Sequence, residues 1–113
     1  MLSYDIKKQI VDQIKKIKPY KIVLFGSHAY GKPNIESDVD LLVFTKDEFL
    51  PKNFTEKNEI YLTVSNEITN IKKKYPINLI AHTKAMHRKF LELDSMFSKK
   101  ITAKGMVLYE END

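Results

Sequence analysis

Short apolar runs alternate along this chain with apolar stripes of helical spacing, and this alternation restricts the possible folds more than any other feature. The first stripe consists of Ile6, Ile10, Ile14 and Ile17. Spacings of three and four residues place these side chains on one face of a helix, which we predict over Ser3–Lys18. Pro19 ends that helix, because the residue before a proline disfavours the helical region of the backbone.

A second and longer stripe lies in the middle of the chain. It consists of Ile60, Val64, Ile68 and Ile71. We expect Thr55 to cap the start of this helix, because a threonine side chain can accept a hydrogen bond from a free amide of the first turn. Pro76 separates the helix from the apolar run that follows.

Two further helical stretches are predicted near the end of the chain. One begins at Thr83 or Lys84, and the other restarts at Asp94 or Ser95 and ends at Gly105. Their large apolar side chains exceed what one helix face must bury, so part of this set either completes the core or forms a partner surface. These side chains are Met86, Phe90, Met96 and Phe97.

The apolar runs between the helices predict β-strands, because they are short and rich in β-branched residues. The runs are Tyr20–Phe25, Val39–Phe44 and Ile77–Ala81, with Met106–Tyr109 as a fourth strand at an edge. Because helices and strands alternate, we expect an α/β (α+β) fold in which a small mixed sheet of three to four strands is flanked by helices. At 113 residues the chain has room for one domain, residues 1–113.

The composition narrows the classes of function. The absence of cysteine excludes disulfides and thiolate metal sites and fits a reducing compartment. No apolar run is long enough to span a bilayer, so we expect a cytoplasmic protein without a membrane partner. The formal charge of +4 favours a polyanion such as a triphosphate. Because the lysines are scattered as on solvated helix faces, we do not expect a nucleic-acid partner, and we leave the oligomeric state open.

The segment from Gly26 to Asp40 carries the residues best suited to chemistry. Gly26 allows a ligand to approach the backbone, and Ser27 opens a short helical turn whose free amides suit phosphate oxygens. Asp38 and Asp40 alternate with Val39, so both carboxylates point to one face of their strand. Hard oxygens at this spacing suit Mg²⁺, which also binds substrate phosphates. The ten residues between Ser27 and Asp38 allow the phosphate turn and the metal pair to converge at adjacent strand ends.

Three histidines are also present, but none has metal-ligand spacing. We expect His82 and His87 at the surface, and we consider His28 as a substrate contact because it adjoins the phosphate turn. No His–Asp relay accompanies Ser27, which argues against a hydrolase.

Gly26-Ser27, ten intervening residues and then Asp38-Val39-Asp40-Leu41 resemble the signature of the DNA polymerase beta-like nucleotidyltransferase superfamily. Within it, the chain resembles the minimal nucleotidyltransferases, or MNT proteins. The resemblance also includes Pro-Ile-Asn-Leu-Ile at 76–80 and the closing Gly-Met-Val-Leu-Tyr-Glu at 105–110.

The resemblance implies specific roles for residues of the site. Gly26 and Ser27 would hold the outer phosphates of ATP, and Asp38 and Asp40 would bind Mg²⁺ and act in catalysis. Asn78 stands where the family has a third carboxylate, which completes the metal site and helps to deprotonate the acceptor. An amide oxygen can bind a metal but cannot accept that proton. The family's usual arginines beside the Gly-Ser turn are absent here, and we expect Lys32 to compensate in part as a phosphate contact.

Two functions from different classes follow. The first is Mg²⁺-dependent transfer of AMP from ATP to a hydroxyl of a partner protein. The resemblance implies the partner, because MNT proteins commonly act as antitoxins that adenylylate a tyrosine of a HEPN-domain toxin. The second is a catalytically weak or inactive nucleotide-binding module that neutralises its partner by contact, and Asn78 favours it.

Overall fold

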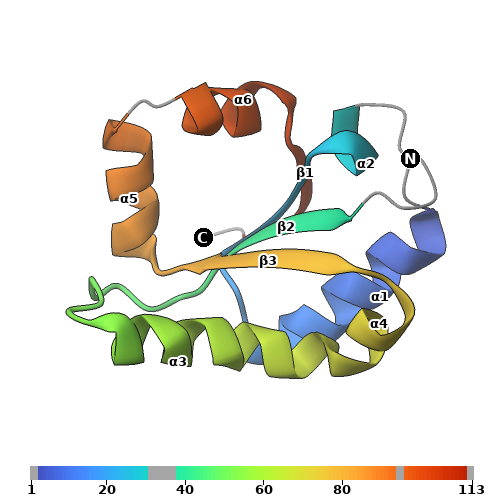
Figure 1. The fold of residues 1–113 in the computed structure, drawn as a ribbon, viewed down its shortest axis with the longest axis horizontal. Helices are drawn as coiled ribbons and strands as arrows, with labels where there is room; N and C mark the ends of the chain where they lie inside the picture. The colour runs from blue at the N-terminus through green and yellow to red at the C-terminus, as the bar shows by residue number, and fades with distance from the viewer. Residues whose placement is uncertain (1–2, 31–37, 94–95, 112–113) are drawn as a thin grey trace.

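The structure, a computed structural model, describes residues 3–30, 38–93 and 96–111. Within these ranges, four strands form one mixed sheet in the order β3-β2-β1-β4 (Figure 1). The strands are β1 (Lys21–Phe25), β2 (Val39–Phe44), β3 (Ile77–His82) and β4 (Met106–Glu110). β1 pairs antiparallel with β2 and β4, whereas β2 pairs parallel with β3. The predicted mixed sheet with helices around it is therefore confirmed, and β4 lies at an edge as expected.

One face of the sheet is covered by the helices that carry the two predicted stripes. These are α1 (Tyr4–Ile14), which continues as the 3₁₀ turn η1 (Lys15–Ile17), and the group α3 (Phe54–Ser65), η2 (Asn66–Ile68) and α4 (Thr69–Lys74). They bury Ile10, Ile14, Ile60, Val64, Ile68 and Ile71 against the sheet. Alternate strand residues complete this main core, which therefore lies between the sheet and the helices with the regular apolar spacing: Ile22, Leu24, Val39, Leu41, Val43 and Ala81.

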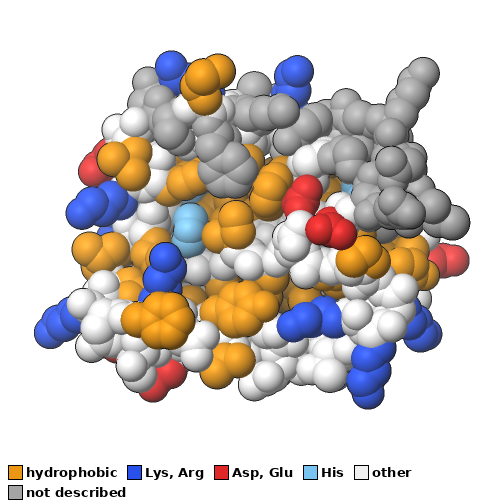
Figure 2. Space-filling view, viewed as in Figure 1, with side chains coloured by type: hydrophobic (Ala, Val, Ile, Leu, Met, Phe, Trp, Pro, Cys, Tyr) orange, Lys and Arg blue, Asp and Glu red, His pale blue; other side chains and the backbone are white. Residues whose placement is uncertain are grey.

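The opposite face carries a smaller core and two further helices. α5 (Lys84–Glu92) and α6 (Met96–Lys104) lie on the side of the sheet away from α1 and α3 (Figure 1). The short helix α2 (Ser27–Tyr30) follows β1, and its Ala29 packs against the main core. The buried residues of this second core are Val23, Phe25, Leu42, Phe44 and Ile101. Phe90 packs against it, so the apolar set near the end of the chain is partly core. Leu93 and Met96 are instead exposed, as are Leu62 and Phe54. Figure 2 shows hydrophobic side chains at the surface of the face that it presents.

The helix ends follow local capping chemistry. Ser3 caps α1 by accepting a hydrogen bond from the amide of Ile6 at 3.3 Å. The predicted helix end at Lys18 is wrong by one residue, because Lys18 has a left-handed backbone with φ of 53°. This residue ends η1 and leads into Pro19. At the other end of the chain, Gly105 follows α6, and its amide donates to the carbonyl of Ile101 at 2.8 Å.

Thr55 does not cap α3, which corrects the prediction. Asn53 does so instead, because its side-chain oxygen accepts a hydrogen bond from the amide of Glu56 at 2.9 Å. Glu56 in turn accepts from the amide of Lys52 at 3.1 Å, so two free amides are satisfied at once. α5 begins at Lys84, one of the two predicted starts, and Thr83 caps it. The predicted restart at Asp94 or Ser95 lies outside the described residues. In the described ranges, no helix combines the length and the apolar content that crossing a membrane requires.

Candidate functional site

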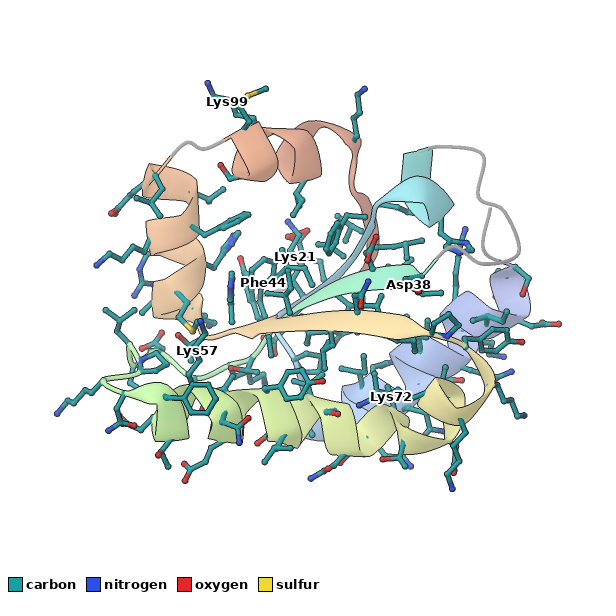
Figure 3. The ribbon with its side chains drawn as sticks, viewed as in Figure 1. Lys21, Asp38, Phe44, Lys57, Lys72 and Lys99 are labelled. Carbon is teal, nitrogen blue, oxygen red and sulfur yellow. The ribbon has the colours of Figure 1, made fainter. Side chains whose placement is uncertain are left out.

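Asp38 and Asp40 lie at the beginning of β2, on the face of the sheet that carries the smaller core. Val39 and Leu41 are buried in the main core, whereas Leu42 belongs to the smaller one. Strand alternation therefore places the two carboxylates on the same side as Leu42. Asp38 is exposed and Asp40 is half-buried. In Figure 3 the label of Asp38 stands at the entry of β2, away from α5. This arrangement agrees with the expected orientation of both side chains.

Asn78 joins these carboxylates from the neighbouring strand. Parallel pairing of β2 with β3 sets Asp40 directly beside Asn78. The side-chain nitrogen of Asn78 donates to Asp38 Oδ2 at 2.9 Å and to Asp40 Oδ1 at 3.0 Å. One amide group thus holds both carboxylates by hydrogen bonds and offsets part of their repulsion. The three residues expected at the metal position do converge in space.

Gly26, which directly follows β1, lies against the carboxylate of Asp40. Its φ of 76° is in the left-handed region, which side chains rarely adopt. A Cβ atom at this position would also collide with the carboxylate of Asp40. β1 pairs Phe25 with Asp40, so the turn that follows β1 comes directly to the carboxylates. Only glycine satisfies both the backbone angle and the close approach.

The short helix α2 begins immediately after this turn, at Ser27. The amide of Ala29 donates to the carbonyl of Gly26 at 3.0 Å, which fixes the first turn of α2 next to Gly26. The backbone of Ser27 is therefore close to the carboxylates, as the phosphate-turn prediction requires. Lys32, the predicted additional phosphate contact, lies outside the described residues.

The side chains at this position fit a Mg²⁺ ion. Both ion pairs found in the described part of the chain, Lys21–Glu110 and Lys46–Glu111, leave Asp38 and Asp40 without a cationic partner. Two carboxylates therefore present hard oxygens to one region of space, which is the donor type that Mg²⁺ prefers. If the side-chain amide of Asn78 rotates by about 180°, Oδ1 takes the place of the nitrogen and can serve as a third oxygen ligand. Among the described residues, no group of three or more His, Asp or Glu side chains is placed to hold a metal ion. The third side chain beside Asp38 and Asp40 is the amide of Asn78.

Comparison with known families agrees with this geometry. The sequence profile of the family described as Polymerase beta, Nucleotidyltransferase matches residues 7–113. The chain belongs to this nucleotidyltransferase family. No curated protein matches the sequence of this nucleotidyltransferase.

Solved structures show the same fold as this nucleotidyltransferase. A chain of a toxin–antitoxin pair with AMP-PNP superimposes with a TM-score of 0.61 at 16% identity, covering 94% of this chain and 74% of that one. A chain of a tri-AMPylated Shewanella oneidensis HEPN toxin in complex with MNT antitoxin gives a TM-score of 0.53 at 16% identity, covering 94% and 71%. At this identity the likeness establishes the fold of the nucleotidyltransferase.

Two histidines of this nucleotidyltransferase do not lie where the sequence predicts them. His82 and His87, expected at the surface, are half-buried on the smaller-core face. Their rings lie beside Phe44, at centroid distances of 6.0 Å for His82 and 4.0 Å for His87. Burial, followed by the charges of His87 and Lys57, lowers the pKa of His82 to about 4. Burial and then the charge of Lys21 also lower the pKa of His87.

A signal for these histidines was present in the sequence. His82 continues the alternation of β3 two residues after Ile80, which packs against the smaller core. His87 precedes Phe90 by three residues, so both side chains share one face of α5. Period-two and period-three spacing would therefore have placed both rings on the inner face.

Proposed function

We propose that this nucleotidyltransferase transfers AMP from ATP to a hydroxyl group of a HEPN-type partner protein, in the presence of Mg²⁺. The observation that carries the proposal is the convergence of Gly26, Asp38, Asp40 and Asn78 on one end of the sheet. The proposal is also supported by the family to which the chain belongs, which is described as a nucleotidyltransferase family. Under this proposal residues 1–113 act as one domain in the cytoplasm, and the partner supplies the acceptor.

The structural neighbours support the choice of nucleotide and partner. One of those structures holds AMP-PNP, an ATP analogue, and another pairs an AMPylated HEPN toxin with an MNT antitoxin. A third is a variant of the toxin–antitoxin pair MntA–HpeT in which two aspartates two residues apart are replaced by glutamates, with a TM-score of 0.58 and 16% identity over 94% of this chain and 74% of that one. The spacing of that altered pair equals the spacing of Asp38 and Asp40.

The proposed reaction assigns a task to each residue. Gly26 and the start of α2 at Ser27 bind the outer phosphates through backbone amides, and Lys32 adds a positive charge. Asp38 and Asp40 hold Mg²⁺, which neutralises charge on the triphosphate. The acceptor oxygen attacks the α-phosphorus, the bond from that phosphorus to the bridging oxygen breaks, and pyrophosphate leaves. Asn78 orients the two carboxylates but cannot take the acceptor proton, which therefore passes to solvent.

A tyrosine is the acceptor that best suits this site. A phenol has a pKa of about 10 and loses its proton far more readily than an aliphatic hydroxyl. An active site without a carboxylate base can therefore still use it.

The proposal is tested by incubating the protein with ATP labelled at the α-phosphate, Mg²⁺ and its HEPN partner. Label should appear on the partner with the unchanged protein and should be lost with Asp38→Asn or Asp40→Asn. Asp12→Asn is the matched control, because it removes the same charge from an exposed position on α1. Equal labelling by all four proteins would refute the assignment of the two carboxylates.

A second function is favoured by the hydrogen bonds of Asn78. Because its amide already holds both carboxylates, the site can remain assembled as a nucleotide-binding module that neutralises the partner by contact. The same experiment separates the two functions. A stable complex with the partner, together with nucleotide binding but no transferred label, would favour the binding module.

A further inference from the structure

A groove of about 480 Å³ lies between the start of α3 and the neighbouring helix α5. Its apolar walls come from Leu50 and Pro51 of the loop before α3, Phe54 of α3 and Met86 of α5. Leu50 and Phe54 are 46% and 79% exposed, although large apolar side chains are usually found inside a protein. Apolar side chains that are exposed together, rather than singly, indicate an interaction surface.

Three lysines surround the same groove, namely Lys52, Lys57 and Lys89. All three are exposed, and neither of the two ion pairs in the described ranges involves them. None of the described residues that line the groove is acidic. The carboxylate of Glu56 instead accepts a hydrogen bond from the backbone amide of Lys52. The groove therefore combines apolar walls with three positive charges.

The two helices contribute to this groove in the same way. Phe54 and Lys57 are three residues apart on α3, and Met86 and Lys89 are three residues apart on α5, so each pair shares one helix face. Figure 3 places Lys57 where β3 leads into α5, above the first turns of α3. Its charge contributes to the low pKa of His82, the last residue of β3, which agrees with this position. Figure 2 shows hydrophobic side chains next to Lys or Arg side chains in this region.

The groove is separate from the candidate nucleotide site. Asn78 lies near the start of β3, whereas α5 follows the end of this strand. The four residues from Asn78 to His82 correspond to roughly 13 Å at the usual rise per residue. The carboxylates of Asp38 and Asp40 do not line the groove.

We propose that this groove binds an acidic segment of a partner protein, in which a large apolar side chain is flanked by aspartates or glutamates. The apolar side chain packs against Leu50, Phe54 and Met86. The flanking carboxylates pair with the ammonium groups around the groove, and this charge complementarity selects acidic segments over basic ones. Binding would cover apolar surface that is exposed in the free chain.

The lining of the groove favours a protein over the other polyanions. Proteins that bind single-stranded nucleic acid stack successive bases on several aromatic side chains, whereas Phe54 is the only aromatic residue among the described residues of the lining. The side-chain oxygen of Asn53 already accepts a hydrogen bond from the amide of Glu56. A bilayer surface is too broad to enter the groove and would contact only its rim. A single apolar side chain with acidic neighbours matches both the walls and the charges.

The preference can be measured by selecting a library of random peptides, displayed on phage, on the full chain. Nucleotide and Mg²⁺ are left out, so the outcome is independent of the transferase proposal. A parallel selection uses the double variant Phe54→Ala/Lys57→Gln, which should fold because both positions are exposed. Peptides enriched only on the unchanged protein should carry a large apolar residue flanked by Asp or Glu. Equal enrichment on both proteins, no enrichment, or enrichment of basic or uncharged peptides would overturn the proposal.

One enriched peptide is then titrated into isotopically labelled protein, and amide chemical shifts are followed by NMR. Saturable shifts are expected at residues 50–57 and 86–89. Phe54→Ala should weaken binding about tenfold, as the loss of an apolar anchor predicts. Lys57→Gln should weaken it about two- to fivefold, as for an exposed ion pair.

Matched control variants remove the same chemistry outside the groove. Leu62→Ala changes an exposed apolar side chain of α3, and Lys73→Gln changes an exposed lysine of α4. Neither residue lines the groove, so both variants should bind the peptide as the unchanged protein does. Shifts confined to other residues, or equal affinity of all four variants, would contradict the proposal. Tighter binding of phosphatidylglycerol vesicles or of oligothymidylate at the same residues would also overturn it, because the groove would then serve a membrane or a nucleic acid.

Discussion

At the scale of single residues, Asn78 decides how the carboxylate cluster behaves with and without a cation. Its amide donates to both Asp38 and Asp40, so the present cluster carries two negative charges held by two hydrogen bonds. Asn78→Asp would replace these donors by a third carboxylate. We expect this variant to unfold at lower temperature without Mg²⁺ and to gain more stability than the unchanged protein when Mg²⁺ is added, because the cation relieves the repulsion. Thermal unfolding with and without Mg²⁺ measures both effects.

The same variant should also transfer AMP faster. A carboxylate at position 78 can accept the proton of the acceptor hydroxyl, and general-base assistance typically contributes about 10²- to 10⁴-fold. The gain should be larger for an aliphatic hydroxyl than for a tyrosine, since a phenol ionises more readily. Single-turnover transfer at matched Mg²⁺ is the measurement, with Asn78→Leu as a control that removes the hydrogen bonds without adding a base. No increase in rate would place residue 78 outside the reaction.

His82 makes the stability of the protein depend on pH. Its pKa is lowered from 6.5 to about 4 by burial and by the charges of His87 and Lys57, so the folded state resists protonation. As the pH falls from 6.5 towards 4, the unfolded chain takes up this proton and the folded chain does not. The free energy of unfolding should therefore decrease over this range, by on the order of 2 kcal/mol once partial exposure of the ring is considered.

Urea unfolding at several pH values would test this effect. His82→Phe should show a weaker pH dependence than the unchanged protein, because the carboxylates titrate in both proteins and cancel in the comparison. Parallel curves for the two proteins would show that His82 does not contribute.

At the scale of elements, the start of α3 depends on one side chain. Asn53 accepts the hydrogen bond from the amide of Glu56, whereas Thr55 lies inside the first turn and is exposed. Asn53→Ala should lower the free energy of unfolding by about 1 kcal/mol, and Thr55→Ala should change it much less. Urea midpoints of the two variants provide the comparison. A larger loss for Thr55→Ala would contradict the observed cap.

The helices and strands were largely predictable from the sequence, whereas their exact ends were not. The start of α3 shows why. The stripe from Ile60 to Ile71 specified a helical face because its spacing is repeated several times. The cap depended on a choice between Asn53 and Thr55, which are both suitable residue types, and only the reciprocal bonds of Glu56 distinguish them.

The candidate site was likewise predictable from the sequence only in part. Strand alternation was enough to orient Asp38 and Asp40 together. The contact of Asn78 with both required the parallel pairing of β2 with β3, which no local pattern contains. His82 and His87 were misplaced because burial of a polar ring depends on what packs across from it, here Phe44 and Phe90.

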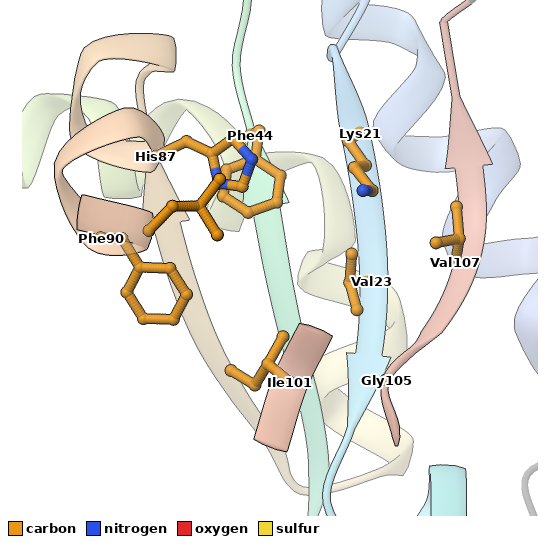
Figure 4. Close-up of a pocket in the computed structure, with 9 residues that line it drawn as sticks. Lys21, Val23, Phe44, His87, Phe90, Ile101, Gly105 and Val107 are labelled. Carbon is orange, nitrogen blue, oxygen red and sulfur yellow. The ribbon is translucent and has the colours of Figure 1, made fainter. Parts of the chain in front are cut away.

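At the scale of the whole molecule, the two faces of the sheet are unequally packed. Among the described residues, the main core contains twelve buried residues and the smaller core contains five. The helices α5 and α6, which cover the smaller core, also border a cavity of about 160 Å³ (Figure 4). Less buried apolar area means that this layer opens more easily than the rest.

Native-state hydrogen exchange should therefore divide the molecule into two layers. Amides of α5 and α6 are expected to exchange at least about tenfold faster than those of β2 and α3, after correction for intrinsic rates. Residues within β2 serve as the internal reference, since that strand is paired on both sides. Uniform protection across all of these elements would show that the molecule opens as a single cooperative unit.

The parallel pairing of β2 with β3 also sets a time order for protein synthesis. Asp38 and Asn78 are forty positions apart, and the parallel arrangement requires the intervening crossover through α3 and α4 before they can meet. At roughly 5–20 residues per second, a ribosome takes roughly 2 to 8 seconds to pass from one to the other. During that interval the emerging chain carries both aspartates without the amide that holds them. The complete cluster is thus a property of chains translated beyond β3, and nascent chains that stop earlier lack it.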